Sequence, residues 1–105
     1  MTTNKNLVHV QIAFRNTEPT DALREFTVDK ISNCLQKFIH QDTEATVVLK
    51  VEKERQIAEI SFHSDGAHFV ASEESNDMYT SIDKLVANTT RQLSKHKEKL
   101  TQHHR

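Results

Sequence analysis

Residues 58–71 read AEISFHSDGAHFVA, with apolar and polar residues alternating on both sides of Asp65-Gly66. This dipeptide is the strongest hairpin signal in the chain, because a type I′ turn needs a positive φ at both central positions. Such a turn fixes which residues of the two strands face each other, and the predicted pairs are Ser64 with Ala67, His63 with His68, Phe62 with Phe69 and Ile60 with Ala71. The two phenylalanines then meet on the inner face of a sheet, and the two histidines meet on its outer face.

Periodicity predicts the remaining elements on either side of this hairpin. Apolar residues recur at every second position in the predicted strands and at spacings of three and four in the predicted helices. The resulting elements are strands over residues 8–14, 45–51 and 58–62 and helices over residues 20–38 and about 76–101. Thr20 is a competent N-cap for the first helix. Polar residues over 39–44 predict a loop, and the join near Glu54-Arg55 carries no turn signal, so its length stays open.

The predicted order is β-α-β-β-β-α, which defines an α+β fold. A chain of 105 residues makes one domain, over residues 1–105, and buries about 60–70% of the surface that its unfolded form exposes. A four-stranded mixed sheet with both helices packed on one face buries the apolar stripes economically. The helical crossover between the first two strands predicts that they run parallel.

Composition excludes several classes of protein. Gly66 is the sole glycine, so neither a phosphate-binding P-loop nor a dinucleotide-binding turn can be formed, and we expect no cofactor. Cys34 is the sole cysteine and cannot form an internal disulfide, which favours a reducing compartment, the cytoplasm. No apolar run approaches the ~18 residues of a membrane span, so we expect no membrane partner.

The charge is strongly polarised along the chain. The formal net charge is −1, but residues 1–83 carry −6 and residues 84–105 carry +5. On a helical wheel, Lys84, Arg91 and Lys95 cluster within about 40° on the face opposite the apolar stripe, with Lys99 beside them. Such a face is either an ordinary solvated surface or a surface that binds a polyanion. Lys30 and Lys37 could extend it if the two helices pack side by side, or they could be ordinary flanking lysines.

Other groups of reactive side chains carry weaker signals. His63 and His68 could supply two ligands to an adventitious cation, but a catalytic zinc needs three protein ligands, so we expect no metal site. No catalytic grouping stands out among the serines and carboxylates, and we expect neither an enzyme nor a small-molecule substrate. Cys34 lies on the apolar side of its helix, which favours a buried thiol over a nucleophile. Tyr79 is expected to pack at the sheet edge, with base stacking as the alternative.

The second helix also carries a family resemblance. Residues 77–83 (DMYTSID), followed by residues 91–97 (RQLSKHK), resemble the C-terminal helix of the ribosome hibernation promoting factor family of small bacterial proteins, which includes the ribosome-associated inhibitor. Residues 22–26 (ALREF) with Lys30, and residues 47–53 (VVLKVEK), are similar to the first helix and second strand of that family. The resemblance covers residues 10 to about 100, and the motifs are specific when taken together.

The resemblance implies a fold similar to double-stranded RNA-binding domains. It also implies binding to the small ribosomal subunit and its rRNA at the mRNA and tRNA sites, with translation silenced in stationary phase or stress. The chain ends soon after the second helix and looks like the short form, which implies promotion of ribosome dimerisation. The RNA-binding residues carried over by position are Arg24, Lys30, Arg91, Lys95, Lys97 and Lys99, and the wheel adds Lys84.

Three functional hypotheses follow from the sequence. The first is a ribosome hibernation factor, monomeric when free, whose basic helical face binds rRNA while its body blocks mRNA and tRNA. The second is a free-standing duplex-RNA-binding module without preference for ribosomes. The third, far weaker, is an enzyme that uses the face of His63 and His68.

Overall fold

The computed structural model confirms the predicted order of elements. It describes residues 7–102, with side chains through residue 99; Arg105, which contributes to the charge of the last segment, lies outside this range. The elements are β1 (Val8–Arg15), α1 (Asp21–Gln36), β2 (Thr43–Glu52), β3 (Arg55–Ser64), β4 (Ala67–Ser75) and α2 (Met78–Gln102).

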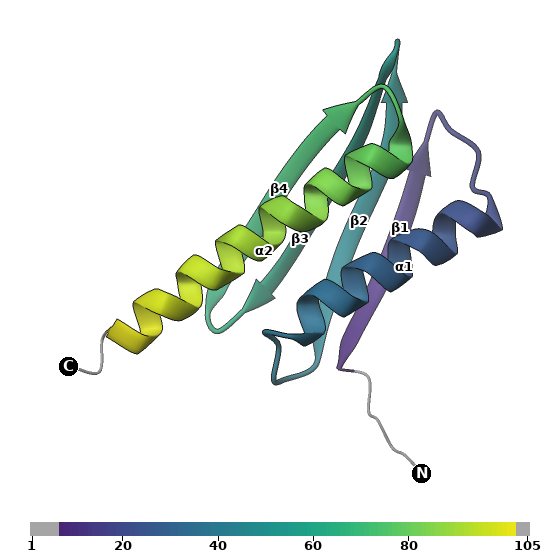
Figure 1. Ribbon diagram of the computed structural model, residues 1–105. Helices are drawn as coiled ribbons and strands as arrows, with labels where there is room; N and C mark the ends of the chain where they lie inside the picture. The colour runs from purple at the N-terminus through teal and green to yellow at the C-terminus, as the bar shows by residue number, and fades with distance from the viewer. Residues whose placement is uncertain (1–6, 103–105) are drawn as a thin grey trace.

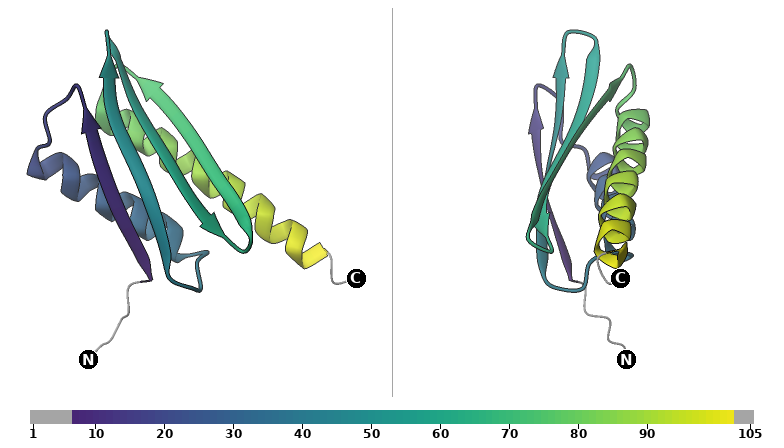
Figure 2. Two further views of the ribbon diagram at one scale, coloured as in Figure 1. Left: turned by 180° about the vertical axis from the view of Figure 1, so that it is seen from behind. Right: turned by 90° about the vertical axis from the view of Figure 1, so that its left-hand side faces the viewer.

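The four strands form one mixed sheet in the order β1-β2-β3-β4. The first two strands run parallel, as the helical crossover predicted, and the other neighbours run antiparallel. Figure 1 shows both helices on the same face of the sheet, and Figure 2 shows that the opposite face is uncovered. α2 continues beyond the β3–β4 turn, so its C-terminal half is more open to solvent than its N-terminal half (Figure 1).

The β3–β4 hairpin has the predicted turn and register. Asp65 and Gly66 adopt φ values of 54° and 75°, as a type I′ turn requires. All four predicted pairs are present: Ser64 with Ala67, His63 with His68, Phe62 with Phe69 and Ile60 with Ala71. The phenylalanine rings stack on the inner face with centroids 5.0 Å apart, and the histidine rings stack on the outer face with centroids 4.3 Å apart.

Gly66→Ala is expected to lower the free energy of unfolding by about 1 kcal/mol, because a residue with a Cβ is strained at this φ. An added Cβ would meet no atom within 4 Å, so the loss comes from the backbone alone. Urea denaturation measures the difference. Lys53→Gly is the matched control, since Lys53 already has a φ of 58° and should lose no stability. A Gly66→Ala variant as stable as the parent would contradict the assigned turn.

Several predicted boundaries were wrong by a few residues. The loop predicted over residues 39–44 is shorter, because Thr43 and Glu44 pair with Val8 and His9 and so extend β2. The open join near Glu54-Arg55 is a two-residue turn in which Lys53 takes a positive φ without any glycine. α1 ends at Gln36 instead of residue 38, and α2 begins at Met78 instead of residue 76.

The core lies between the sheet and the helices. Its most buried side chains come from both layers: Ile31 and Leu35 of α1, Val47 and Leu49 of β2, Ile60 and Phe62 of β3, and Ile82 and Leu85 of α2. The predicted cap is also present, since the Leu23 backbone N–H donates to Thr20 Oγ1 at 3.2 Å. Cys34 is buried as predicted, and burial raises the pKa of its thiol, so the thiol stays protonated and is a poor nucleophile.

Candidate nucleic-acid interface

The C-terminal half of α2 presents a row of exposed cations, which we name the α2 row: Arg91, Lys95 and Lys99. Each follows the previous one by four residues, so the row spans about 12 Å on one flank of the helix. Leu93 is buried against the rest of the protein, and this fixes the flank of α2 that faces solvent. Among residues 7–99, no carboxylate lies within 4.0 Å of the three cationic groups.

Four of the other basic side chains differ from the α2 row because they contact carboxylates or a carbonyl: Lys30, Lys50, Arg55 and Lys84. Lys50 Nζ lies 3.3 Å from a Glu59 carboxylate oxygen. Arg55 Nε donates to Glu74 at 3.0 Å, and this guanidinium holds the pKa of the Glu74 carboxyl below its ordinary value. The α2 row is therefore distinguished by three neighbouring cations on one helix flank that have no carboxylate within 4.0 Å among the described residues.

Lys84 is exposed, as the wheel predicted, but its ammonium is engaged. Its Nζ donates to the Glu74 carbonyl oxygen at 3.0 Å. The contact ties the N-terminal part of α2 to the end of β4, two turns away from Arg91. Lys84 therefore lies on the same flank of α2 as the α2 row, but its side chain is directed toward Glu74 at the end of β4.

The two candidate residues of α1 lie on different sides of that helix. Lys30 Nζ is 3.9 Å from Asp83 of α2 and 5.4 Å from the centre of the Phe26 ring, so it lies between the helices. The Arg24 guanidinium lies 5.2 Å from the Phe14 ring of β1, away from α2. The structure thus places Lys30 beside α2, whereas Arg24 is separate from the α2 row.

Lys97 is exposed but lies on another side of α2. It follows Lys95 by two positions, which turns it about 200° around the helix axis. The predicted residues therefore do not form one patch. The structure brings Arg91, Lys95 and Lys99 together. Lys84 lies two turns away on the same flank, whereas Arg24, Lys30 and Lys97 lie at other positions around the two helices.

Two polar side chains of α2 that the sequence reasoning missed hold the helix against β4. Asn88 Nδ2 donates to a Glu73 carboxylate oxygen at 2.8 Å, and Gln92 Nε2 donates to the Val70 carbonyl oxygen at 3.1 Å. Their spacing of four from each other and from Lys84 was the available signal. They orient α2 about its axis and so set the direction in which the α2 row points.

Tyr79 packs differently from the prediction. Its ring meets Phe26 edge to face, with centroids 4.8 Å apart, so it packs between the two helices and not at the sheet edge. The ring is 40% exposed. This contact packs the N-terminal end of α2 against α1.

The histidines do not form a metal centre within the described residues. Among residues 7–99, no three His, Cys, Asp or Glu side chains come close enough together to hold a metal ion. The rings of His63 and His68 are stacked within 9° of parallel, so their lone pairs do not converge on one point as tetrahedral ligands must.

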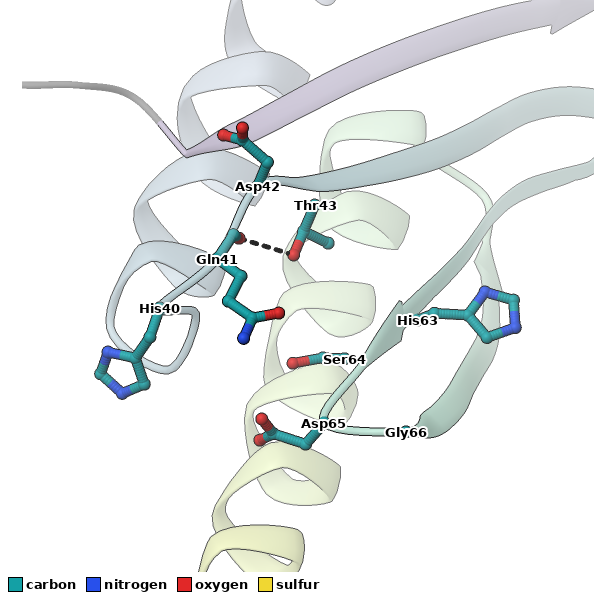
Figure 3. Close-up of a pocket in the computed structure, with 8 residues that line it drawn as sticks. All are labelled: His40, Gln41, Asp42, Thr43, His63, Ser64, Asp65 and Gly66. Carbon is teal, nitrogen blue, oxygen red and sulfur yellow. Dashed lines mark hydrogen bonds between the residues drawn. The ribbon is translucent and has the colours of Figure 1, made fainter.

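A cavity of about 230 Å³ between the α1–β2 loop and the β3–β4 turn also lacks the features of a catalytic site. In Figure 3, the rings of His40 and His63 point away from the space and in opposite directions. Thr43 Oγ1 donates to the Gln41 carbonyl oxygen at 3.0 Å, so this hydroxyl is occupied within the loop. The lining side chains therefore do not place a base beside a nucleophile.

These observations define a small α+β domain that presents a row of cations on a long C-terminal helix. The chain belongs to the Sigma 54 modulation protein / S30EA ribosomal protein family, whose model matches residues 10–101. This membership confirms the family resemblance and, because the family comprises non-enzymatic ribosome factors, the prediction that the chain is not an enzyme. Over the described residues, neither helix has an apolar stretch long enough to span a bilayer.

Individual relatives agree with this assignment. The chain is 43% identical over 96 residues to the ribosome hibernation promoting factor of Klebsiella oxytoca, covering 91% of this chain and 100% of the relative. The factor of the same name from Escherichia coli strain K12 is 41% identical over the same shares. The solved structure of a ribosomal subunit interface protein from Coxiella burnetii matches with a TM-score of 0.77 and 27% identity, covering 86% of this chain and 98% of that one. These similarities confirm the fold and support a role in ribosome hibernation.

Proposed function

We propose that this protein is a ribosome hibernation factor that binds the small ribosomal subunit through the α2 row. The observation that carries the proposal is the exposure of Arg91, Lys95 and Lys99 without a carboxylate partner among the described residues, in a chain whose relatives are named ribosome hibernation promoting factors. The cytoplasm, where ribosomes occur, is then its place of action.

The chemistry of the α2 row suits RNA phosphates. Cations that already pair with a carboxylate must lose that partner before they can bind a phosphate, whereas the α2 row has no such partner to lose among the described residues. Binding phosphates releases the counterions condensed on RNA, which favours association at low salt. The acidic remainder of the chain opposes indiscriminate contact with RNA, so affinity concentrates on one face.

The folded body supplies the inhibitory part of the proposal. Held by the α2 row, the sheet and α1 occupy space that mRNA and tRNA would otherwise fill, and translation stops by steric exclusion in stationary phase or stress. Because the relatives are named ribosome hibernation promoting factors, the proposal also includes promotion of the dimerisation of inactive ribosomes by the bound protein.

The dependence of binding on salt tests the proposal. Three phosphate contacts predict that affinity for small subunits falls at least about 20-fold between about 50 and 200 mM monovalent salt at fixed magnesium. The measurement is co-sedimentation of the purified protein with small subunits through a sucrose cushion. Binding that does not respond to salt would contradict a phosphate-contacting site.

A competitor in the same experiment separates this function from a general duplex-RNA-binding module. Excess plain duplex RNA should leave the ribosome-bound fraction nearly unchanged if the protein recognises the small subunit. Complete displacement by plain duplex would favour the general module.

A further inference from the structure

A shallow hollow of about 300 Å³ lies between the start of β4 and the C-terminal half of α2. The two elements that form it meet near the β3–β4 turn (Figure 1). Two members of the α2 row border it, and none of its lining residues carries a negative charge. They are His68, Phe69, Gln92, Lys95, His96 and Lys99.

We propose that this hollow binds one phosphate group of the RNA backbone and takes up protons on His68 and His96 when it does. The affinity for RNA therefore rises as the pH falls. The proposal rests on the proposed function, because it places a specific phosphate beside the α2 row. It adds a binding site and a dependence on pH that the charges of the lysines alone would not produce.

The hollow is already shaped before any ligand binds. Phe69 is 7% exposed, and the His96 ring meets it edge to face with centroids 5.3 Å apart. Gln92 is held at the rim by its hydrogen bonds to the Val70 carbonyl oxygen at 3.1 Å and to Asn88 Oδ1 at 2.9 Å. A site with fixed walls loses little conformational entropy on binding, which favours a small anion over non-specific contact.

His96 has a buried ring nitrogen that gains a partner on protonation. Its Nε2 is buried and has no hydrogen-bond partner among the described residues, but it lies 3.8 Å from Asp65 Oδ2 of the β3–β4 turn. A proton on Nε2 turns this atom into a charged donor opposite a carboxylate. A phosphate in the hollow places negative charge near this ring and so favours its protonated form in the complex.

His68 can change charge without losing its hydrogen bond. Its Nε2 lies 3.0 Å from Ser61 Oγ, and a hydroxyl can donate to the neutral ring or accept from the protonated one. On its other side, His63 stacks at 4.3 Å, and two charged rings at this distance repel each other. The stacked pair is therefore expected to take up one proton, and the phosphate draws that proton to His68.

The summed charge sets the expected size of the effect. Protonation of His68 and His96 adds two positive charges to those of Lys95 and Lys99, while Asp65 and His63 are the charged or titratable groups that face the histidines from β3 and its turn. Histidine ordinarily changes charge between about pH 5 and 8. Each proton taken up per complex gives up to tenfold tighter binding per pH unit, so a net uptake that averages about two-thirds of a proton over the two rings gives about tenfold from about pH 7.5 to 6.0.

The test measures the affinity for purified small subunits at these two pH values and at constant ionic strength. The parent protein is expected to bind about tenfold more tightly at the lower pH. His68→Gln/His96→Gln removes both titrating rings and should show less than about a twofold difference. His9→Gln/His40→Gln is the matched control, because these histidines lie outside the hollow, and it should keep the tenfold increase.

Each other outcome has a definite meaning. A parent affinity that does not change with pH, or a double variant that keeps the full increase, would overturn the phosphate site and leave the proposed function standing. Absence of binding at both pH values and at low salt would overturn both. Thermal denaturation checks that the double variant is folded; if it is not, His68→Gln alone, at an exposed side chain, must still reduce the increase.

Discussion

Replacing Arg91 and Lys95 by glutamate is expected to abolish co-sedimentation of this protein with small ribosomal subunits. Hydrogen bonds between charged groups contribute about 1.5–3 kcal/mol each, so reversing two such contacts weakens binding by roughly a hundredfold or more. The loss arises because two glutamates would face the rRNA phosphates where the parent protein presents two cations, so attraction is replaced by repulsion between like charges. The measurement is pelleting of the variant with purified small subunits at low salt.

The fold of this double variant should be unchanged. Both side chains are exposed, and glutamate is about as good a helix former as arginine or lysine. A glutamate at position 95 also lies four residues before Lys99, an arrangement that stabilises a helix slightly. The circular dichroism spectrum should therefore match that of the parent protein.

The matched control reverses two exposed cations at the other end of the molecule. Arg15→Glu/Lys53→Glu changes the net charge by the same amount but lies at the end of β1 and in the β2–β3 turn. It should bind small subunits far better than the α2 variant does. An equal loss of binding in both variants would show that only the net charge matters. Full binding by the α2 variant would contradict the proposed interface.

Phe62→Ala is expected to have the largest effect on stability, a loss of about 3–5 kcal/mol in the free energy of unfolding. Phe62 is 2% exposed and stacks on Phe69 across the hairpin. Removing its ring leaves a cavity at the centre of the inner face, which the backbone of a paired strand cannot close. Domains of this size are stable by only about 5–15 kcal/mol, so much of the total would be lost.

Urea denaturation followed by circular dichroism measures this loss. Val70→Ala is the control, because Val70 lies on the adjacent strand with 56% of its surface exposed and should change stability by less than about 0.5 kcal/mol. A Phe62→Ala variant within about 1 kcal/mol of the parent protein would mean that the two phenylalanines do not anchor the core.

The sequence predicted those parts of the fold that local chemistry determines. Asp65-Gly66 fixed the register of four residue pairs, because few other dipeptides adopt two positive φ values in succession. The β2–β3 turn escaped prediction because Lys53 takes a positive φ without any signal in its residue type. Ile57 breaks the expected alternation, because it is buried on the outer face beside Lys50 and Glu74. The alternation therefore placed the start of the strand at residue 58, three residues after the first residue of β3.

The candidate site was predictable only as far as one helix can be treated alone. The wheel correctly indicated that Lys84, Arg91 and Lys95 are exposed, because exposure follows from the apolar stripe of the same helix. It could not indicate that Lys84 reaches a carbonyl of β4 or that Arg24 packs on Phe14. Those contacts depend on how each helix packs against the neighbouring strand, and the periodicity of a single helix carries no information about that packing.

The contacts of Lys84 and Gln92 with β4 have a consequence for the behaviour of the protein in solution. β4 is the last strand of the sheet, and an uncovered edge strand is a template onto which a strand of another molecule can add. Lys84 and Gln92 occupy the outward carbonyl oxygens of Glu74 and Val70, which such a strand would need. One helix therefore both carries the α2 row and disfavours the addition of a foreign strand at the β4 edge of the sheet.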